Sequence, residues 1–298
     1  YLGETRYQGW DITEAVKGQK TLTLGILDRF YSGGQGRVDT MQGVLGHFVI
    51  YYADGSSQTV VTDGTWTAID GPYFGNTTRN SEGDYVEECD GRKVLEGWAQ
   101  AGYDASEWGA VHVHGTHPTK TFTHVQAELS HVTEEEIYPV SITKLEDGTT
   151  VADFGKVIPA RLSIHFANGK EGQKYTIQTG YELTDSGAIN TNKESTQSTN
   201  MTFIYTQKDG EQTYNTWDHL GFRYVSIPAK EEEFSKEDIK AFILYTEVPA
   251  GRDSTFESSN DMLNQVYELM KRSAIYSVQN QFVDTPTREK GQFLQDTV

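Results

Sequence analysis

Residues 47–66 read HFVIYYADGSSQTVVTDGTW, and this stretch indicates the fold class of the chain. Two runs rich in β-branched and aromatic residues flank the Asp-Gly pair at 54–55, which is a strong signal for a β-hairpin. The runs KTLTLGIL (20–27) and GAVHVHG (109–115) also have strand character, and helical periodicity is almost absent from this part of the chain. Many short strands joined by Gly and Asp turns favour a β-sandwich or jelly roll over residues 1–130.

Residues 131–250 repeat this character and predict a second β-sandwich. We expect the boundary between the two sandwiches near SHVTEEE (130–136). The polar stretch DSGAINTNKESTQSTN (185–200) is poor in apolar residues and is expected to be a surface loop. Strands are expected in EIYPVSITKLEDGTTVADFG, ARLSIHF, QKYTIQTGYEL, MTFIYTQKDGEQTY, FRYVSI and KAFILYTEV.

The composition is that of a polar globular protein with a sizeable aromatic core. The hydrophobic fraction is 36%, and 17 Tyr, 13 Phe and 5 Trp supply core material. The net charge of -18 repels phosphate backbones and anionic membranes, so neither nucleic acid nor a membrane is an expected partner. A neutral substrate feels no such repulsion. Cys89 is the single cysteine of the sequence, which excludes an internal disulfide and a cysteine-rich zinc site.

The compartment of the protein is left open by the sequence. No run of about eighteen apolar residues is present, so no membrane-spanning helix is expected. The opening residues YLGETRYQGWDIT lack the apolar core of a signal peptide, and we expect the first sandwich to be truncated at its start. A cytoplasmic location and a secreted or periplasmic one both remain compatible with this chain.

Residues 258–282, SSNDMLNQVYELMKRSAIYSVQNQF, predict a long amphipathic helix. Ser258 or Ser259 is the expected N-cap, and Asp261 lies in the first turn, where the helix dipole favours an acid. Such a helix needs partner helices to cover its apolar face, and we expect this face to be poorly covered. The residues at the helical spacing are Met262, Leu263, Val266, Leu269, Met270 and Ser273.

A cluster of charges follows this helix in VDTPTREKGQFLQDTV (283–298). Asp284, Glu289 and Asp296 are separated by five and seven residues, and Pro286 places them in a loop. Cleaving a glycosidic bond needs one carboxylic acid to protonate the leaving oxygen and a second carboxylate to activate water or to attack. Carboxylates grouped in a loop raise one another's pKa, which helps to keep one of them protonated.

Arg288 stands between these carboxylates and could steady an ionised neighbour or bind hydroxyl groups. The alternative is a solvated charged loop, which is common in an acidic protein and which the spacing alone favours.

Two further groups of residues are weaker candidates for a site. The histidines His112, His114, His117, His124 and His131 fall within twenty residues, and the first two would share one face of a strand, as metal ligands can. A polar strand face with scattered loop histidines is the simpler interpretation.

The aromatic turn GWAQAGYDASEW (97–108) sets Trp98, Tyr103 and Trp108 among small and acidic residues. Aromatic faces beside carboxylates can bind sugar rings, and core packing is again the simpler interpretation. The sequence contains no Gly-rich phosphate loop, nucleophile elbow or dinucleotide-binding pattern. An ATPase, a dehydrogenase and a serine hydrolase are therefore not expected.

The chain resembles the bacterial α-L-rhamnosidases of glycoside hydrolase family 78 over nearly its whole length. In the first predicted sandwich the resemblance rests on WDITEAVKGQKTLTLGI, YYADGSSQTVVTDGTW, EGDYVE and GWAQAGYDASEW, in that order. In the second it rests on VADFGKVIPARLSIHF, GQKYTIQTGYEL and GFRYVSI. The segment from residue 254 to residue 296 resembles the entry to the family's (α/α)6 barrel. The resemblance thus implies a mostly β chain of two sandwiches followed by the first helix and loop of a barrel, over residues 251–298.

The resemblance also implies roles for the charged loop. Asp284, Pro286 and Arg288 match the family's Asp-x-Pro-x-Arg core, Glu289 resembles its general acid, and Asp284, Arg288 and Asp296 resemble rhamnose-binding residues. Some members place the glutamate one residue later and have Trp in place of Leu294, which leaves the division of roles between Glu289 and Asp296 open.

The implied activity is inverting hydrolysis of terminal α-L-rhamnosyl residues in glycosides or polysaccharides, with no cofactor. The family's general base is a glutamate far downstream that this chain does not contain, so the chain alone is expected to be inactive. A carbohydrate-binding β-sandwich protein without catalysis is the alternative. The segment 258–298 discriminates against it, since a pure binding module has no use for an amphipathic helix followed by an acidic loop.

Overall fold

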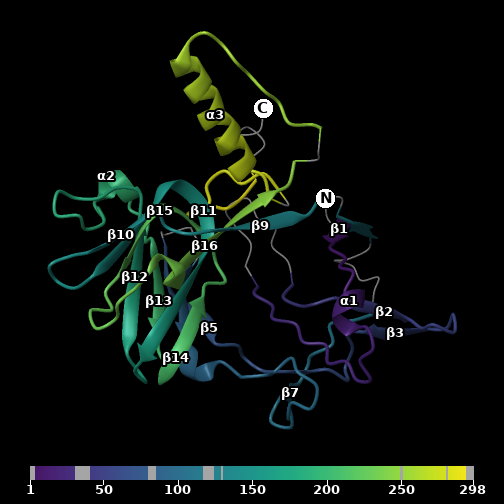
Figure 1. The fold of residues 1–298 in the computed structure, drawn as a ribbon. Coiled ribbons are helices and arrows are strands. Elements are labelled where there is room, and N and C mark those ends of the chain that lie inside the picture. Colours follow the sequence, from purple (N-terminus) through teal and green to yellow (C-terminus); the bar gives the residue numbers. More distant parts are fainter. Residues whose placement is uncertain are drawn as a thin grey trace. The chain divides into compact units, whose positions relative to one another are not determined.

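The structure is a computed structural model, and it describes residues 4–30, 41–79, 85–116, 124–128, 130–248, 251–279 and 281–292. The described residues divide into two compact units. The first unit comprises 4–30, 41–71, 94–116 and 124–128, and the second comprises 72–79, 85–93 and the described residues from 130 onward. Most of the regular structure is β-strand, as the sequence predicts (Figure 1).

The first unit contains three two-stranded ladders among its described residues. The hairpin predicted around residues 54–55 is confirmed, because β2 and β3 are antiparallel and Gly55 has the left-handed φ of 85° that its turn requires. The other two ladders are parallel β1–β8 and antiparallel β4–β7. The bounds are β1 Glu4–Tyr7, α1 Thr13–Val16, β2 His47–Tyr51, β3 Ser57–Val61, β4 Thr67–Ala68, β7 Gly109–Ala110 and β8 His124–Ala127.

One strand prediction in the first unit is wrong, and another holds only in part. The run 20–27 has no regular secondary structure, and in 109–115 the strand β7 is confined to the first two residues. The ring of Trp98 lies against the first run, so close to Gly25 that an added Cβ would come within 2.4 Å of it. This contact is made at Gly25, and the large apolar residues Leu22, Ile26 and Leu27 of the run are exposed, so the run lacks the buried face of a strand.

The second unit contains one ten-stranded sheet with the order β5-β6-β13-β12-β15-β11-β16-β9. Strands β10 and β14 also pair with β11 and lie off this path. The strand bounds are β5 Tyr73–Thr78, β6 Tyr85–Asp90, β9 Val132–Ile137, β10 Ser141–Lys144, β11 Thr150–Gly169, β12 Lys174–Gly180, β13 Thr202–Thr206, β14 Gly210–Asn215, β15 Leu220–Ile227 and β16 Ile239–Thr246. The helices are the 3-10 turns η1 Gly91–Lys93 and η2 Lys236–Asp238 and the α-helices α2 Lys193–Thr196 and α3 Asp261–Tyr276.

Strand β11 organises the sheet because it pairs with four other strands along its length. Its register with β15 shifts between Asp153 and Ile158, and Gly155 has a φ of 78° within this irregular stretch. The Asp153 carboxylate accepts the Gly155 N–H at 2.6 Å and two bonds from Arg223 of β15 at 2.8 and 2.9 Å. Side-chain hydrogen bonds thus stabilise the irregular stretch of β11.

The hydrophobic core lies entirely within the second unit among the described residues. Aromatic rings stack through it: Phe166 lies 5.8 Å from Tyr175 and 5.7 Å from Tyr205, and Tyr205 lies 4.4 Å from Tyr214. The other fully buried side chains include Ile158, Leu162, Ile164, Ile177, Met201, Phe203, Leu220, Phe222 and Ile227. Burial of this apolar area, at roughly 25 cal/mol per Å², is the main stabilising contribution to the sheet.

The strands β5 and β6 come from the first half of the chain and extend the sheet of the second unit. β6 runs parallel to β13, with Cys89 opposite Tyr205. The predicted boundary near 130–136 would place both strands in the first domain, whereas in the structure residues 72–79 and 85–93 group with the second unit. The stretch 185–200, predicted as a surface loop, is largely irregular but contains the single turn α2, capped by Asn192.

The predicted helix is present as α3 but begins and ends differently. Its N-cap is Asn260, whose side chain accepts the N–H groups of Met262 at 3.0 Å and Leu263 at 3.4 Å, and not Ser258 or Ser259. The helix ends at Tyr276, six residues before the predicted end, and a β-bridge between Val278 and Phe282 follows it. No helix among the described residues is long and apolar enough to cross a membrane.

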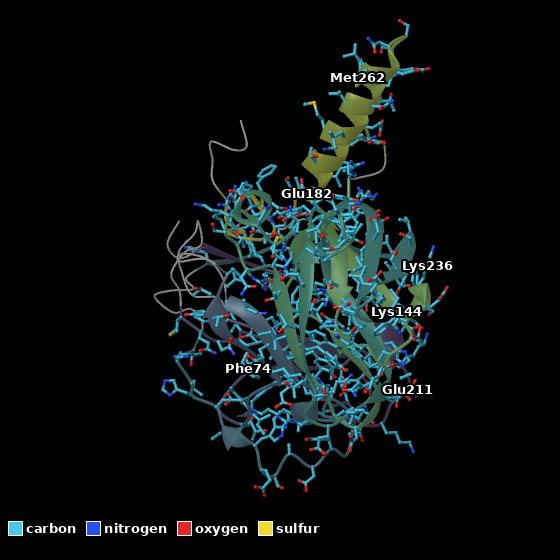
Figure 2. All side chains as sticks on the ribbon, turned by 90° about the vertical axis from the view of Figure 1, so that its left-hand side faces the viewer. Phe74, Lys144, Glu182, Glu211, Lys236 and Met262 are labelled. Carbon is cyan, nitrogen blue, oxygen red and sulfur yellow. The ribbon has the colours of Figure 1, made fainter. Side chains whose placement is uncertain are left out.

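The apolar face of α3 is exposed in this chain. Tyr276 in the last turn lies 6.4 Å from Tyr245 of β16, and Met262 at the other end of the helix lies away from the sheet (Figures 1 and 2). The segment before the helix contacts it through Phe256, whose ring lies 5.3 Å from that of Tyr267. The residues left exposed are Met262, Leu263, Val266, Leu269 and Met270.

Candidate active site

The charged segment after α3 forms a closed loop, which we call the acid loop and define as residues 284–291. The N–H of Asp284 donates to the carbonyl of Gly291 at 3.1 Å, and the N–H of Lys290 donates to the carbonyl of Thr285 at 3.1 Å. Lys290 has a φ of 53°, the left-handed conformation that non-glycine residues rarely adopt. The acid loop lies in the second unit, next to the beginning of β15 (Figure 1).

Glu289 is held by two neighbours within the acid loop. The hydroxyl of Thr285 donates to its Oε2 at 2.6 Å, and the Arg288 Nε lies 3.4 Å from the same oxygen. The Glu289 side chain is 19% exposed and the Arg288 side chain 33%. The carboxylate is thus fixed in orientation while remaining accessible from solvent, as a group that reacts with a substrate must be.

The structure describes three of the four residues predicted for the site. Arg288 and Glu289 are in contact, and Asp284 lies half-buried at the closing point of the same loop. Asp296 lies outside the described residues. The structure therefore brings three of the predicted residues into one loop.

Thr287, which sequence reasoning missed, and Pro286 attach this loop to the sheet. The Thr287 Oγ1 accepts the N–H of Gly221 at 2.9 Å and lies 3.2 Å from the hydroxyl of Tyr181. Pro286 packs on the same glycine so closely that a Cβ at Gly221 would lie 2.8 Å from its Cγ. Close approach of two backbones is a signal for glycine, but one sequence does not show which segment makes the approach.

Lys290 makes the deepest contact of the acid loop, and sequence reasoning missed it as well. Its ammonium forms an ion pair with Asp218 and donates to the carbonyl of His219 at 2.7 Å. The Lys290 side chain is 7% exposed and the Asp218 side chain 1%. A lysine is seldom buried without such a partner, so the pairing accounts for its position.

Asp218 also binds Arg79, whose Nη2 lies 3.3 Å from Oδ2 and whose side chain is fully buried. Glu87 of β6 lies beside this pair, since its carboxylate accepts the N–H of Asp218 at 2.6 Å and the hydroxyl of Tyr214 at 2.8 Å. Two cations and two anions are therefore buried together. We call Arg79, Glu87, Asp218 and Lys290 the buried charge cluster.

The low polarity around the cluster shifts the pKa of two neighbours. Burial, and next the charge of Lys290, lowers the pKa of His219 to about 3, so this histidine is neutral at ordinary pH. Burial, and next the charge of Glu87, raises the pKa of Tyr214 well above its usual value. A lowered pKa for a histidine and a raised pKa for a tyrosine are both expected where water is excluded, and both residues lie beside the buried charge cluster.

Two family models match the sequence. The model described as "Alpha-L-rhamnosidase N-terminal domain" matches residues 1–144, and the model described as "Bacterial alpha-L-rhamnosidase concanavalin-like domain" matches residues 143–245. The two matches are adjacent and together run from residue 1 to residue 245. The chain belongs to the bacterial α-L-rhamnosidases.

Curated α-L-rhamnosidases resemble this family member over almost its whole length. The protein from Streptomyces avermitilis is 25% identical over 97% of this chain, and that from Formosa agariphila is 26% identical over 99% of it. These matches cover 28% and 32% of the two relatives, so the chain spans about a third or less of their length.

Solved α-L-rhamnosidase structures share the fold of this family member. The Streptomyces avermitilis enzyme, solved as a complex with L-rhamnose, superimposes with a TM-score of 0.68 and 25% identity over 83% of this chain and 23% of its own. The enzyme from Dictyoglumus thermophilum superimposes with a TM-score of 0.67 over 81% of this chain and 26% of its own, at 24% identity.

The other candidate groups of this rhamnosidase-family chain show ring contacts among their described residues. The rings of His112 and His114 lie edge to face at 4.9 Å, and His117 is outside the described residues. No group of three or more His, Cys, Asp or Glu side chains suited to a metal ion occurs among the residues that the structure describes. In the aromatic turn, the ring of Trp108 lies 6.5 Å from that of Trp98 and 5.9 Å from that of Tyr103, so these rings pack on one another.

Proposed function

We propose that this chain supplies the β-rich part and the acid loop of an inverting α-L-rhamnosidase, which hydrolyses terminal α-L-rhamnosyl residues of glycosides or polysaccharides. The observation that carries the proposal is the state of Glu289: a half-buried, oriented carboxylate on a closed loop that is attached to the sheet. Membership of the rhamnosidase family supports the choice of sugar, and the L-rhamnose complex of the Streptomyces avermitilis relative points the same way.

Glu289 is the proposed proton donor. Among the described residues, the contacts of Thr285 and Arg288 both fall on Oε2. Oε1 is therefore the oxygen that we assign to proton transfer onto the glycosidic oxygen as it leaves rhamnose. Asp284, Arg288 and Asp296 are assigned to binding the sugar hydroxyls, because ionised acceptors and guanidinium donors form the stronger hydrogen bonds.

The second carboxylate of the reaction is proposed to lie outside these 298 residues. An inverting glycosidase holds its two carboxyl groups roughly 6.5–9.5 Å apart, so that the base can activate a water on the opposite face of the sugar. We assign the first unit to an amino-terminal β-sandwich domain, the ten-stranded sheet of the second unit to a second β-sandwich, and residues 251–298 to the beginning of an (α/α)6 barrel. The exposed apolar face of α3 supports this last assignment, since a helix of that kind packs against further helices.

The test compares Glu289→Gln and Asp296→Asn in the full-length protein on a natural rhamnosyl disaccharide and on a dinitrophenyl rhamnoside. Loss of the donor should lower kcat on the disaccharide by roughly 10²–10⁴-fold and should affect the activated substrate much less, because its leaving group departs without a proton. Loss of a sugar-binding acid should affect both substrates alike.

Two outcomes would contradict the assignment. If Asp296→Asn spares the activated substrate while Glu289→Gln damages both equally, the two roles are reversed. If the full-length protein binds rhamnosides without turning them over, it is a carbohydrate-binding protein and not a hydrolase.

The 298-residue chain by itself is expected to be inactive on aryl α-L-rhamnosides. Turnover above a Glu289→Ala control would contradict the placement of the general base outside these residues.

A further inference from the structure

We propose that Lys290 is a positioning residue: its ammonium, buried against Asp218 and the carbonyl of His219, fixes the acid loop on the sheet and thereby aims Glu289. The role assigned to Glu289 rests on the proposed function, whereas the attachment of the loop does not. The inference therefore makes the sheet of the second unit a structural part of the proposed site.

The backbone at Lys290 links its side chain to that of its neighbour. Glu289 and Lys290 are consecutive, and the left-handed φ of 53° at Lys290 turns the chain between them. The lysine side chain is buried at the foot of the loop, while the Glu289 carboxylate remains partly exposed. Because a non-glycine residue holds this conformation only when its surroundings impose it, the contacts of the ammonium help to set the direction of Glu289.

The partner of Lys290 is itself rigidly held. The Asp218 carboxylate accepts the N–H of His219 at 2.9 Å on the oxygen that meets Lys290, and Arg79 lies on its other oxygen. The N–H of Asp218 is bound by Glu87. A side chain with so many fixed contacts has one position, so the ammonium of Lys290 has one position as well.

Thr287 and Pro286 give the loop a second attachment, at Gly221. The two attachment points are three residues apart in the loop, at Thr287 and Lys290, and three residues apart in the segment that leads into β15, at Asp218 and Gly221. Two separate contacts prevent the loop from rotating about either one, and a catalytic group must be held within about half an ångström of its productive position. Removing the ammonium should therefore release a rotation of the loop rather than unfold the sheet.

The first experiment measures hydrogen exchange on the 298-residue chain in Lys290→Met, Asp218→Asn and the double variant. Lys271→Met is the matched control, because this lysine of α3 also carries an ion pair, with Asp253 at 2.8 Å. Amides of residues 284–292 should exchange about tenfold faster in Lys290→Met while those of β12 and β15 stay protected. The double variant should add little to either single change, since the two residues act as one contact.

Three results of this experiment would overturn the inference. The first is unchanged exchange of residues 284–292 in Lys290→Met. The second is the same acceleration in the Lys271→Met control. The third is loss of protection throughout the sheet in both Lys290→Met and the milder Lys290→Gln, which would assign the lysine to folding of the whole unit.

The second experiment uses the full-length protein and tests the aim of Glu289. A loop displaced by about one ångström lowers catalysis by about 10²-fold. Lys290→Met should reduce kcat on the natural disaccharide much more than on the dinitrophenyl rhamnoside, and it should add nothing when Glu289 is already replaced by Gln. Equal losses on both substrates, or additive losses with Glu289→Gln, would contradict a positioning role. If the wild-type protein hydrolyses no rhamnoside, the proposed function fails, and the exchange experiment still decides the attachment of the loop.

Discussion

Gly221 has a role at the scale of single residues that its backbone angles do not reveal. It carries no positive φ, yet the Pro286 ring and the Thr287 hydroxyl both lie against it. A glycine of this kind is needed because two segments approach one another, not because a turn requires a left-handed conformation. The acid loop packs directly against the Cα of Gly221, where any larger residue would place its Cβ.

Gly221→Ala should therefore displace the acid loop. The new Cβ would lie 2.8 Å from Pro286 Cγ and 3.2 Å from Thr287 Oγ1, and a proline ring cannot turn aside as a flexible side chain does. We expect faster hydrogen exchange in residues 284–292 and a loss of stability of about 1–3 kcal/mol in urea unfolding. Gly109→Ala is the control, since the nearest atom to its Cβ would be 3.8 Å away. Equal behaviour of the two variants would show that the loop does not depend on this contact.

Capping decides how α3 begins at the scale of the element. Asn260→Ala removes the acceptor of the Met262 and Leu263 N–H groups and should lower helix stability by about 1 kcal/mol. Faster exchange in the first turn of α3 is the measurement. Ser259→Ala is the comparison, and it should leave this exchange unchanged. A larger effect of Ser259 than of Asn260 would restore the cap position that the sequence favours.

His165 joins three elements of the second unit. It lies on β11, and its ring nitrogens are 2.9 Å from the Asp238 carboxylate of η2 and 3.0 Å from the Glu211 carboxylate of β14. Glu211 is labelled in Figure 2 at the edge of the unit. The hydrogen bond to Asp238, then that to Glu211, raises the pKa of His165 above its usual value.

The sign of the resulting pH dependence follows from linkage. A raised pKa in the folded state means that the protonated histidine stabilises the fold below the unfolded value of about 6.5, and that this contribution is lost as pH rises through the higher folded pKa. Wild type should therefore lose stability relative to His165→Gln as pH rises through that window, and added salt should weaken the difference because the site is partly exposed. If the free energies of unfolding of the two proteins depend on pH in the same way, the contacts of His165 with Asp238 and Glu211 do not contribute to stability.

The elements differ in how well the sequence predicted them. The hairpin at 54–55 and the existence of α3 depend on local patterns, and both are found. The run 20–27 has the local pattern of a strand, but Leu22, Ile26 and Leu27 are exposed, and β-propensity depends on packing and burial. The attachment of Lys290 to Asp218 was beyond prediction because 72 residues separate the partners and no periodicity relates them.

The whole second unit depends on residues from the first half of the chain. β6 contributes Glu87, and the segment that ends β5 contributes Arg79, so the buried charge cluster is complete only when residues 72–93 are present. A piece beginning at residue 131 would leave Asp218 without Arg79 and β13 without its parallel neighbour. The contacts of the second unit thus include residues that lie before the boundary near 130–136.

We therefore expect residues 131–298, made alone, to be much less stable in urea than the same residues within the 298-residue chain. Removing one partner of a buried ion pair costs about 3–5 kcal/mol, and the loss of β5 and β6 adds to it. The measurement is the midpoint and steepness of the transition for this piece and for the whole chain, followed by tryptophan fluorescence. A piece starting at 131 that is as stable as the same residues in the whole chain would show that β5 and β6 are accessory.

The buried charge cluster also limits how relatives of this chain can be recombined. Its four members lie in three separate stretches of sequence, around residues 79–87, at 218 and at 290. A chimera that takes everything after residue 251 from a relative would replace Lys290 while keeping its three partners. Such a hybrid should be functional only when the donor brings a cation of the same reach, so crossover points for protein engineering belong where all four positions come from one parent.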